Sequence, residues 1–387
     1  MSDERVLAKT ATRETPVPDV PVAEASSDVR LSVEDFEAVA RSKLPRMVYD
    51  YYAGAAGDEW TLAENRRAFA RWALRPRVLN DVSNVSLETA VLGTPLAFPI
   101  ALAPTAFQRL AHREGELATA RAAASLGTLM VLSTISTTPM EDVARTGVTR
   151  WFQLYVMKDH AITESLLERA VDCGYRAVVL TVDTPWLGRR LRDERNGFSL
   201  PPGIGMANLR NVRMPRGDSS GSKLASFFAT DHDAALSWKD LEWLRSKVTV
   251  PLLLKGIVTA EDARMACDHG IDGIVVSNHG GRQLDGCIAT LDALPEVVDA
   301  VEGRCEVLVD GGVRRGSDVL KALALGARAV LVGRPYLWGL AADGEAGVRR
   351  ILEMLRDELS LAMSLSGQAS VSDIDRSLVR PAPGASP

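Results

Sequence analysis

The sequence predicts an α/β fold, a (β/α)8 or TIM barrel, with an N-terminal helical extension and a long loop after strand 4. Eight short apolar runs recur from about residue 97, each with the length of a buried parallel strand. Amphipathic helical patterns separate most of these runs, as in successive βαβ units. An open doubly wound sheet is the alternative, but the even count of eight strands favours a closed barrel.

The predicted strands are the apolar runs at residues 98–104, 128–133, 151–155, 177–182, 250–255, 273–277, 306–310 and 329–333. The helical patterns that alternate with them span residues 114–126, 159–173, 237–247, 259–269, 290–301 and 317–325, and a last one follows at 345–365. The gap that begins at Ser136 is shorter and predicts only a brief helix.

The chain before the barrel divides into a polar tail and a helical extension. Residues 1–29 mix Pro, Ser, Thr, Glu and Asp with scattered apolar residues, a composition that predicts a disordered tail. A helix is expected from Ser32 through Leu44, because Asp35 follows Ser32 by three positions, as in a capping box, and apolar residues then recur at helical spacing.

Three tyrosines follow in the next helical segment. Because Tyr49, Tyr51 and Tyr52 precede an Ala/Gly turn, one or two of their phenols are expected to face a site instead of the core. The predicted domain spans residues 30–370, and residues 371–387 form a C-terminal tail.

The connection between the fourth and fifth strands is much longer than the other connections. Residues 183–236 are rich in Gly, Pro, Ser and charge, and loops of this length are uncommon in compact domains unless they are functional or mobile. We predict a lid over the mouth of the barrel, mobile over residues 195–236 and least ordered over 203–222. An inert disordered insertion is the alternative.

Composition excludes several classes of function. The 387 residues carry a net charge of −5 with both signs interspersed, which gives no basic stripe for nucleic acid and favours small-molecule partners. The four cysteines are far apart without a CxxC pair, so no metal site, haem attachment or disulfide framework is expected, and a reducing cytoplasm fits. No apolar run reaches the roughly 18 residues of a membrane span, and the N-terminus lacks a hydrophobic signal core.

One stretch carries the clearest chemistry. Residues 273–286 read GIVVSNHGGRQLDG, so that His279 lies two residues beyond a buried strand and Arg282 three residues later. A histidine exchanges protons near neutral pH, and an arginine binds carboxylate or phosphate with two hydrogen bonds. The pair predicts an anionic substrate and proton abstraction, with a structural histidine and a helix-capping arginine as the alternative.

Polar residues follow all the predicted strands, at the end where TIM barrels place their active sites. A buried lysine, glutamine or threonine without partners would cost a few kcal/mol, so their shared position indicates function. The residues at the first seven strand ends are Pro104, Thr105, Ala106, Ser133, Gln153, Tyr155, Thr181, Asp183, Arg190, Lys255, Ser277, His279 and Asp310, and all of them except Pro104 and Ala106 are polar.

The last two strand ends predict a phosphate site. Residues 309–316 read VDGGVRRG, and Gly333 and Arg334 follow the eighth strand. Glycines let backbone N–H groups approach an anion, and arginine adds charge. The anion would belong to a phosphorylated substrate or to a cofactor such as FMN. Lys255 would then stabilise a reduced flavin, or would form a Schiff base in a flavin-free lyase.

These motifs resemble those of the FMN-dependent α-hydroxy-acid oxidases and dehydrogenases, a family that includes glycolate oxidase. The resemblance covers about residues 31–370 and includes, in order, LPRMVYDYYAGAA, DEWTLAENRRAF, LRPR, ALAPTAFQRLAHREGE, FQLYV, LTVDTPWLGRR, LLLKGI, SNHGGRQLD, DGGVRRG and GRP. It implies oxidation of an (S)-2-hydroxy acid to the 2-oxo acid, with O2 reduced to H2O2, in a homotetramer or homo-octamer.

The resemblance also implies roles for individual residues. His279 would be the catalytic base, oriented by Asp183, and would take its proton from the hydroxyl or from the α-carbon. The implied substrate contacts are Tyr51, Tyr155, Arg190 and Arg282, and the two tyrosines are also expected to take part in catalysis. The implied FMN contacts are Pro104, Thr105, Ala106, Ser133, Gln153, Thr181, Lys255, Ser277, Asp310, Gly311, Gly312, Arg314, Gly333 and Arg334.

The chain departs from glycolate oxidase at one position. Where that enzyme has a tryptophan in LSSWATSS, this chain reads LSTISTTP and has Ile135. The smaller side chain predicts a substrate larger than glycolate, aromatic or aliphatic, with Phe107 as a further wall of the pocket or an ordinary core residue.

Two alternative activities remain at this point. A dehydrogenase that passes electrons to a cytochrome or quinone is disfavoured, because the N-terminal tail is too short for a haem domain and the long loop lacks a strongly apolar stretch. A barrel without enzymatic activity is disfavoured by the intact set of Asp183, His279 and Arg282.

Overall fold

The structure is a computed structural model that describes residues 29–210 and 223–384. The predicted N-terminal tail lies outside the described residues except for Val29, and so does most of the loop segment expected to be least ordered. Residues 32–387 cluster as one compact unit, which contains the barrel.

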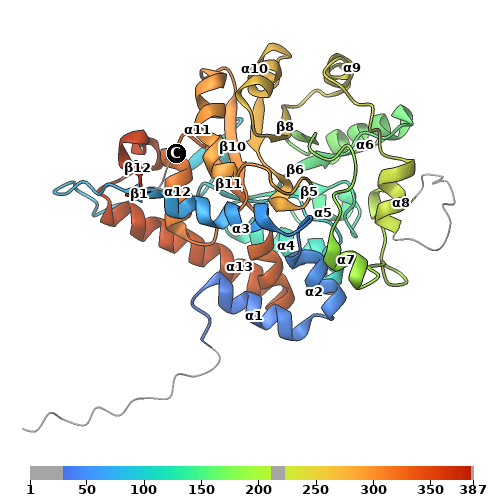
Figure 1. Ribbon diagram of the computed structural model, residues 1–387, viewed down its shortest axis with the longest axis horizontal. Helices are drawn as coiled ribbons and strands as arrows, with labels where there is room; N and C mark the ends of the chain where they lie inside the picture. Colours follow the sequence, from blue (N-terminus) through green and yellow to red (C-terminus); the bar gives the residue numbers. More distant parts are fainter. Residues whose placement is uncertain (1–28, 211–222, 385–387) are drawn as a thin grey trace, which may run out of the picture. The chain divides into compact units, whose positions relative to one another are not determined.

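Eight parallel strands close into a barrel, as predicted (Figure 1). Each strand pairs with the next along the chain, and the eighth pairs with the first through Val330 and Ile100. The strands are β4 (Ile100–Leu102), β5 (Leu129–Ser133), β6 (Thr149–Leu154), β7 (Val178–Thr181), β8 (Leu252–Ile257), β9 (Gly273–Val276), β10 (Glu306–Asp310) and β11 (Ala329–Val332).

The predicted helices alternate with these strands. They are α4 (Gly115–Ser125), the brief α5 (Met140–Ala144), α6 (His160–Asp172), α9 (Asp240–Lys247), α10 (Ala260–Asp268), α11 (Thr290–Val301), α12 (Gly316–Ala324) and α13 (Arg334–Leu365). Helix α13 begins well before the predicted residue 345, and Asp343 and Gly344 depart from helical geometry within it. The sequence pattern therefore detected only the part of α13 that follows this kink.

The N-terminal extension forms α1 (Val33–Lys43), α2 (Arg46–Ala53) and α3 (Trp60–Arg67). The capping box is present, because Asp35 N donates to Ser32 Oγ over 3.1 Å and Ser32 N donates to Asp35 Oδ2 over 2.9 Å. Helix α1 packs against α13 (Figure 1). Helix α3 packs against the turn that contains His279, so the extension reaches the carboxyl ends of the barrel strands.

Two small sheets were not predicted. The hairpin of β2 (Thr89–Val91) and β3 (Thr94–Leu96) packs Val91 and Leu96 with side chains inside the barrel such as Trp151, and covers the amino ends of its strands. Strand β12 (Val379–Pro381) pairs with β1 (Trp72–Leu74), so the C-terminal segment returns to the extension. Strands of three residues are too short for alternation of apolar and polar residues to reveal them.

The long connection after β7 contains α7 (Leu191–Arg195) and α8 (Lys223–Thr230), with the 3-10 turn η3 (Ala207–Leu209) between them. Leu224, Phe227 and Phe228 on α8 are buried. The part of this connection that forms α8 thus contributes apolar side chains to the core.

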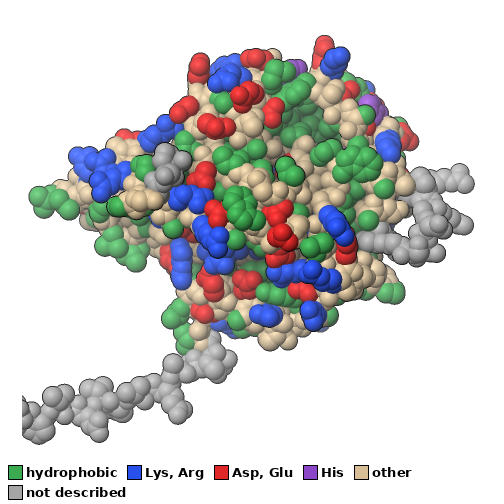
Figure 2. Space-filling view, viewed as in Figure 1, with side chains coloured by type: hydrophobic (Ala, Val, Ile, Leu, Met, Phe, Trp, Pro, Cys, Tyr) green, Lys and Arg blue, Asp and Glu red, His purple; other side chains and the backbone are tan. Residues whose placement is uncertain are grey.

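On the face of the protein seen in Figure 2, neither sign of charge dominates. Lys and Arg side chains are interspersed with Asp and Glu on the face seen in Figure 2. Among the helices that the structure describes, none is both long enough and apolar enough to cross a membrane.

Candidate active site

A cavity of about 1190 Å³, its open mouth included, lies at the carboxyl ends of the barrel strands. Nineteen of the predicted site residues line it. They are Tyr51, Pro104, Thr105, Ala106, Ser133, Ile135, Gln153, Tyr155, Thr181, Arg190, Lys255, His279, Arg282, Asp310, Gly311, Gly312, Arg314, Gly333 and Arg334. Asp183 and Ser277 lie behind this lining and contact it through His279 and Lys255.

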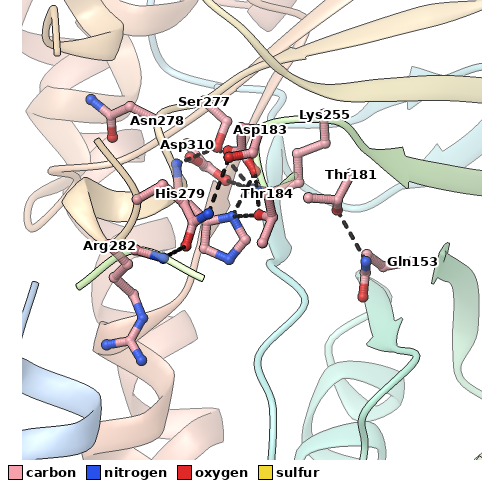
Figure 3. A network of polar contacts seen from close by, with 12 residues as sticks. Gln153, Thr181, Asp183, Thr184, Lys255, Ser277, Asn278, His279, Arg282 and Asp310 are labelled. Atoms are coloured by element: carbon pink, nitrogen blue, oxygen red, sulfur yellow. Dashed lines mark hydrogen bonds and ion pairs between the residues drawn. The ribbon is translucent and has the colours of Figure 1, made fainter. Parts of the chain in front are cut away.

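The ring of His279 is held from one side. Its Nδ1 lies 2.8 Å from Asp183 Oδ1 and 3.3 Å from Thr184 Oγ1 (Figure 3). The backbone of His279 has φ 58°, and its N–H donates to Ser277 Oγ over 3.1 Å. Because Nδ1 is taken by the carboxylate, the histidine presents Nε2 as its second functional atom.

Electrostatics keep His279 in the form of a base. Burial lowers the pKa of His279, and the Asp183 carboxylate opposes this shift without cancelling it, while Lys255 and Arg190 lower the pKa further. Burial by itself would raise the pKa of Asp183, but His279 and its hydrogen bond hold that pKa below its ordinary value. At neutral pH the imidazole is therefore neutral, donates its Nδ1 proton to Asp183, and can accept a proton at Nε2.

Lys255 is a buried cation. Its Nζ donates to Ser277 Oγ over 2.8 Å and lies 3.0 Å from Asp310 Oδ2 (Figure 3). Burial would lower the pKa of Lys255, but Asp310 and Asp183 outweigh it, so the net shift is upward. A Schiff base requires a neutral amine, so this environment argues against lyase chemistry at Lys255.

A polar row connects the ends of three neighbouring strands. Gln153 Oε1 accepts from Ser133 Oγ over 3.1 Å and from Thr134 N over 3.2 Å, and Gln153 Nε2 donates to Thr181 Oγ1 over 3.0 Å. This amide is fixed by its neighbours, so its orientation in the cavity is set before any ligand binds.

The ends of β10 and β11 form the predicted anion site. Gly311 and Gly312 have φ values of 98° and 86°, and a side chain at Gly312 would collide with the Asn65 carbonyl oxygen. The Arg314 side chain donates from Nη1 to the Val313 carbonyl. Within the described residues, Arg314 Nε and Asp310 Oδ1 are buried without a hydrogen-bond partner. The cavity thus holds a donor and an acceptor that a ligand would satisfy.

Arg334 has a different environment from the one expected. Its guanidinium donates to the carbonyl oxygens of Tyr52, Gly280 and Gly54 at 2.8 to 3.0 Å, and it also lines the cavity. These bonds join α2 to the turn of His279. Arg334 therefore helps to hold the turn that contains His279.

The substrate side of the cavity is cationic and aromatic. The Arg282 guanidinium lies 5.0 Å from the ring centroid of Tyr51, and Nη1 is anchored on the carbonyl oxygens of Tyr51 and Gly54. Burial lowers the pKa of Arg190 to about 10, with Arg282 adding to the shift, so Arg190 is still charged at neutral pH. Phe198 stacks on Tyr51 at 4.2 Å and brings the long connection over this side.

Several lining residues were missed from the sequence. Thr184, Leu187, Leu224 and Phe228 all line the cavity. The apolar pair at i and i+4 on α8 was a detectable signal, but the surrounding polar loop obscured it. Phe107 is fully buried and lies against Tyr51 with ring centroids 6.1 Å apart, outside the cavity lining. The structure supports its interpretation as core.

A (β/α)8 barrel with an anion site after its last two strands and a histidine base beside a buried lysine belongs to the class of barrel enzymes that use a phosphate-bearing cofactor. The chain belongs to the FMN-dependent dehydrogenase family, whose description residues 40–381 match. It is therefore an FMN-dependent oxidoreductase.

Named relatives cover almost the whole chain. L-lactate oxidase of Nostoc sp. is 54% identical, over 90% of this chain and 98% of the relative. 2-Hydroxyacid oxidase 1 of Homo sapiens is 52% identical, over 91% of this chain and 97% of the relative. The crystal structure of a mandelate oxidase with (S)-4-hydroxymandelic acid matches with a TM-score of 0.85 and 47% identity, over 91% of this chain and 99% of that chain.

The residues present fit FMN. The unpaired Arg314 Nε and the glycine turn suit the phosphate, and the unpaired Asp310 Oδ1 suits a ribityl hydroxyl, which can donate to it. The protonated Lys255 suits the ring position where reduction places negative charge. The cofactor predicted from the sequence is thus confirmed by the family.

Proposed function

We propose that this protein oxidises (S)-2-hydroxy acids to 2-oxo acids and reduces O2 to H2O2. The observation that carries the proposal is the His279 and Asp183 pair, which lies in one cavity with Arg190 and Arg282. The oxidase names of the relatives support O2 as acceptor over a cytochrome or quinone.

The residues act in two stages. Arg282 and Arg190 bind the substrate carboxylate, and the Tyr51 phenol adds a donor, which places the α-carbon and its hydroxyl in reach of His279. His279 Nε2 then takes a proton, from the hydroxyl in a hydride route or from the α-carbon in a carbanion route, and Asp183 stabilises the imidazolium. FMN, when bound, supplies the two-electron acceptor.

The substrate side chain is proposed to be larger than that of glycolate. Ile135 lines the cavity and is 4% exposed, and Leu187 and Phe228 provide further apolar surface there. Each methylene that such a wall newly buries is worth about 0.8 kcal/mol. An aromatic or longer aliphatic 2-hydroxy acid therefore gains more from this cavity than glycolate does.

The assembly and location are proposed from the resemblance and composition. We expect a homotetramer or homo-octamer in the cytoplasm, and light scattering after size exclusion would measure the assembly.

The principal test of function is an assay with the purified FMN-loaded protein, in which (S)-lactate or (S)-mandelate should consume O2 and release one H2O2 per 2-oxo acid formed. Release of 2-oxo acid without H2O2 would contradict the oxidase assignment.

A further inference from the structure

His232 is a buried histidine that no step of the proposed reaction uses. It is 3% exposed, and its Nδ1 has no hydrogen-bond partner in the part of the chain that the structure describes. Burial lowers the pKa of His232, so the ring is uncharged at neutral pH and can pack as an aromatic group.

The ring of His232 packs on two walls of the active-site cavity. Its centroid lies 5.5 Å from that of Tyr155, with an interplanar angle of 83°, and 5.2 Å from that of Phe228. Tyr155 and Phe228 also contact one another edge to face at 5.2 Å. The three rings form a single aromatic cluster, and His232 itself is not among the residues that line the active-site cavity.

The backbone holds His232 in this place. His232 forms an isolated antiparallel bridge with Met157, and the flanking hydrogen bonds are Asp233 N to Val156 O at 3.0 Å and Lys158 N to Asp231 O at 2.9 Å. The chain that leaves α8 is thereby tied to the chain that follows Tyr155. Movement of the His232 ring would therefore move the wall that α8 and β6 build together.

His232 also lines a second cavity. This cavity has an empty volume of about 860 Å³, its mouth included, and His232, Ala234 and Leu236 are among its lining residues. Thr181 and Thr184 line both cavities. His232 thus contacts the aromatic wall of the active site and also lines the second cavity.

We propose that His232 is a positioning residue that limits the depth of the substrate cavity by holding Tyr155 and Phe228 away from the second cavity. The inference rests on the proposed function. It predicts that the size of the side chain at residue 232 decides which 2-hydroxy acids fit, although residue 232 touches none of them.

The test compares a large and a small substrate in FMN-loaded variants. In His232→Ala the two aromatic rings gain room to retract, so the ratio of kcat/KM for (S)-3-phenyllactate to that for (S)-lactate should rise about tenfold or more. His232→Phe preserves a ring of similar size, so its ratio should stay within about twofold of the wild-type value. An unchanged ratio in His232→Ala, or an equal change in His232→Phe, overturns the proposal.

Two further variants separate this role from general loosening of the fold. His269 packs its ring at 5.4 Å from that of Trp238 and lines neither cavity, so His269→Ala should leave the ratio unchanged. Adding Ala234→Phe to His232→Ala fills the second cavity and should return the ratio toward wild type. A comparable shift in His269→Ala, or no reversal in the double variant, overturns the proposal.

Binding gives a readout that does not depend on turnover. The dissociation constants of pyruvate and phenylpyruvate can be measured from changes in the flavin spectrum. In His232→Ala, the affinity for phenylpyruvate should rise relative to the affinity for pyruvate. If alanine lowers the yield of folded protein, His232→Val provides the same comparison with a smaller expected rise. Wild-type protein that fails to oxidise either acid refutes the proposed function, whereas active variants with constant ratios refute only the role of His232.

Discussion

At the scale of single residues, the turn that contains His279 has a strained backbone, and hydrogen bonds from neighbouring residues stabilise it. His279 adopts φ 58°, a left-handed conformation that costs a non-glycine residue of order 1 to 3 kcal/mol. Ser277 Oγ accepts from its backbone N–H, and the Asn278 side chain accepts from Gly281 N and exchanges two 2.8 Å bonds with Asn65. These contacts orient the imidazole toward the cavity while its Nδ1 rests on Asp183.

Replacement of His279 tests its role as base. His279→Gln should retain bound FMN but lose roughly three or more decades in the rate of flavin reduction by substrate, because both the base and its positioning are lost. Anaerobic stopped-flow absorbance measures this rate. His269→Gln is the control, and normal reduction in His279→Gln would refute the assignment.

The pH profile follows from the protonation state of His279. Only the neutral imidazole accepts a proton, and its pKa lies below the ordinary value of 6.5. The profile of kcat/KM should therefore be flat near neutral pH and should fall as pH drops through that lowered pKa. Asp183→Asn removes the charge that opposes the shift and should move the acid limb to lower pH. An acid limb above pH 6.5 in the wild type would contradict this reasoning.

Ile135 provides the residue-scale test of substrate size. Ile135→Trp should favour glycolate over mandelate, reversing the wild-type order of kcat/KM, because the indole refills the space beside the substrate side chain. Oxygen-electrode assays with both acids give the ratio. Leu361→Trp, at an exposed position on α13, is the control. If the ratio is unchanged in Ile135→Trp, selectivity must be set elsewhere in the cavity.

At the scale of elements, three segments outside the regular βα repeat complete the site. Helix α3 supplies Thr61 N and the preceding turn supplies Asp58 N, and both donate to Asp285 over 2.9 Å. Helix α8 contributes Leu224 and Phe228 to the cavity wall. The β2–β3 hairpin closes the opposite end of the barrel. The βα repeat thus provides the strand ends that carry the site residues, and the segments outside the repeat orient and enclose these residues.

The capping box of α1 gives a prediction for stability. Ser32→Ala should lower the free energy of unfolding of the FMN-loaded protein by about 1 kcal/mol, because Asp35 N loses its acceptor. Urea unfolding followed by circular dichroism measures the change. Ser42→Ala, on the exposed end of the same helix, is the matched control and should change little. Equal effects of the two substitutions would contradict the capping role.

At the scale of the whole molecule, the cavity joins residues that are far apart in sequence. Tyr51, Arg190, His279 and Arg314 come from the extension, the long connection and two different strand ends. A ligand that contacts all of these regions binds only the folded chain, so it stabilises the whole unit by mass action.

FMN should therefore raise the melting temperature of the apoprotein more than riboflavin does. At 100 times its Kd, a ligand contributes about 2.7 kcal/mol, and riboflavin lacks the phosphate that Arg314 and the glycine turn suit. Differential scanning fluorimetry would compare the two. Arg314→Gln should reduce the FMN effect and leave that of riboflavin, whereas equal shifts for both ligands in the wild type would argue against this phosphate site.

Local sequence patterns were enough to predict the barrel and most of the residues that line the cavity at its carboxyl end. Eight apolar runs of strand length alternate with amphipathic helices, and both patterns are local, so they can be seen without contacts. The polar residues that follow these runs were predictable as one site because parallel strands in a barrel end on the same face. For the same reason, His279, Lys255 and Asp310 were identified before any distance was known.

The contacts that these side chains make with one another could be seen only in the tertiary structure. Ser277 accepts a hydrogen bond from Lys255 behind the cavity lining, Arg334 donates to three backbone carbonyl groups, and Phe107 proves to be a core residue and not a wall of the cavity. His232 packs against Tyr155 across 77 positions of sequence, and although the long loop was predicted to be functional, nothing in its composition distinguished His232. Such contacts depend on how separate elements pack, and packing is a long-range property that local periodicity does not encode.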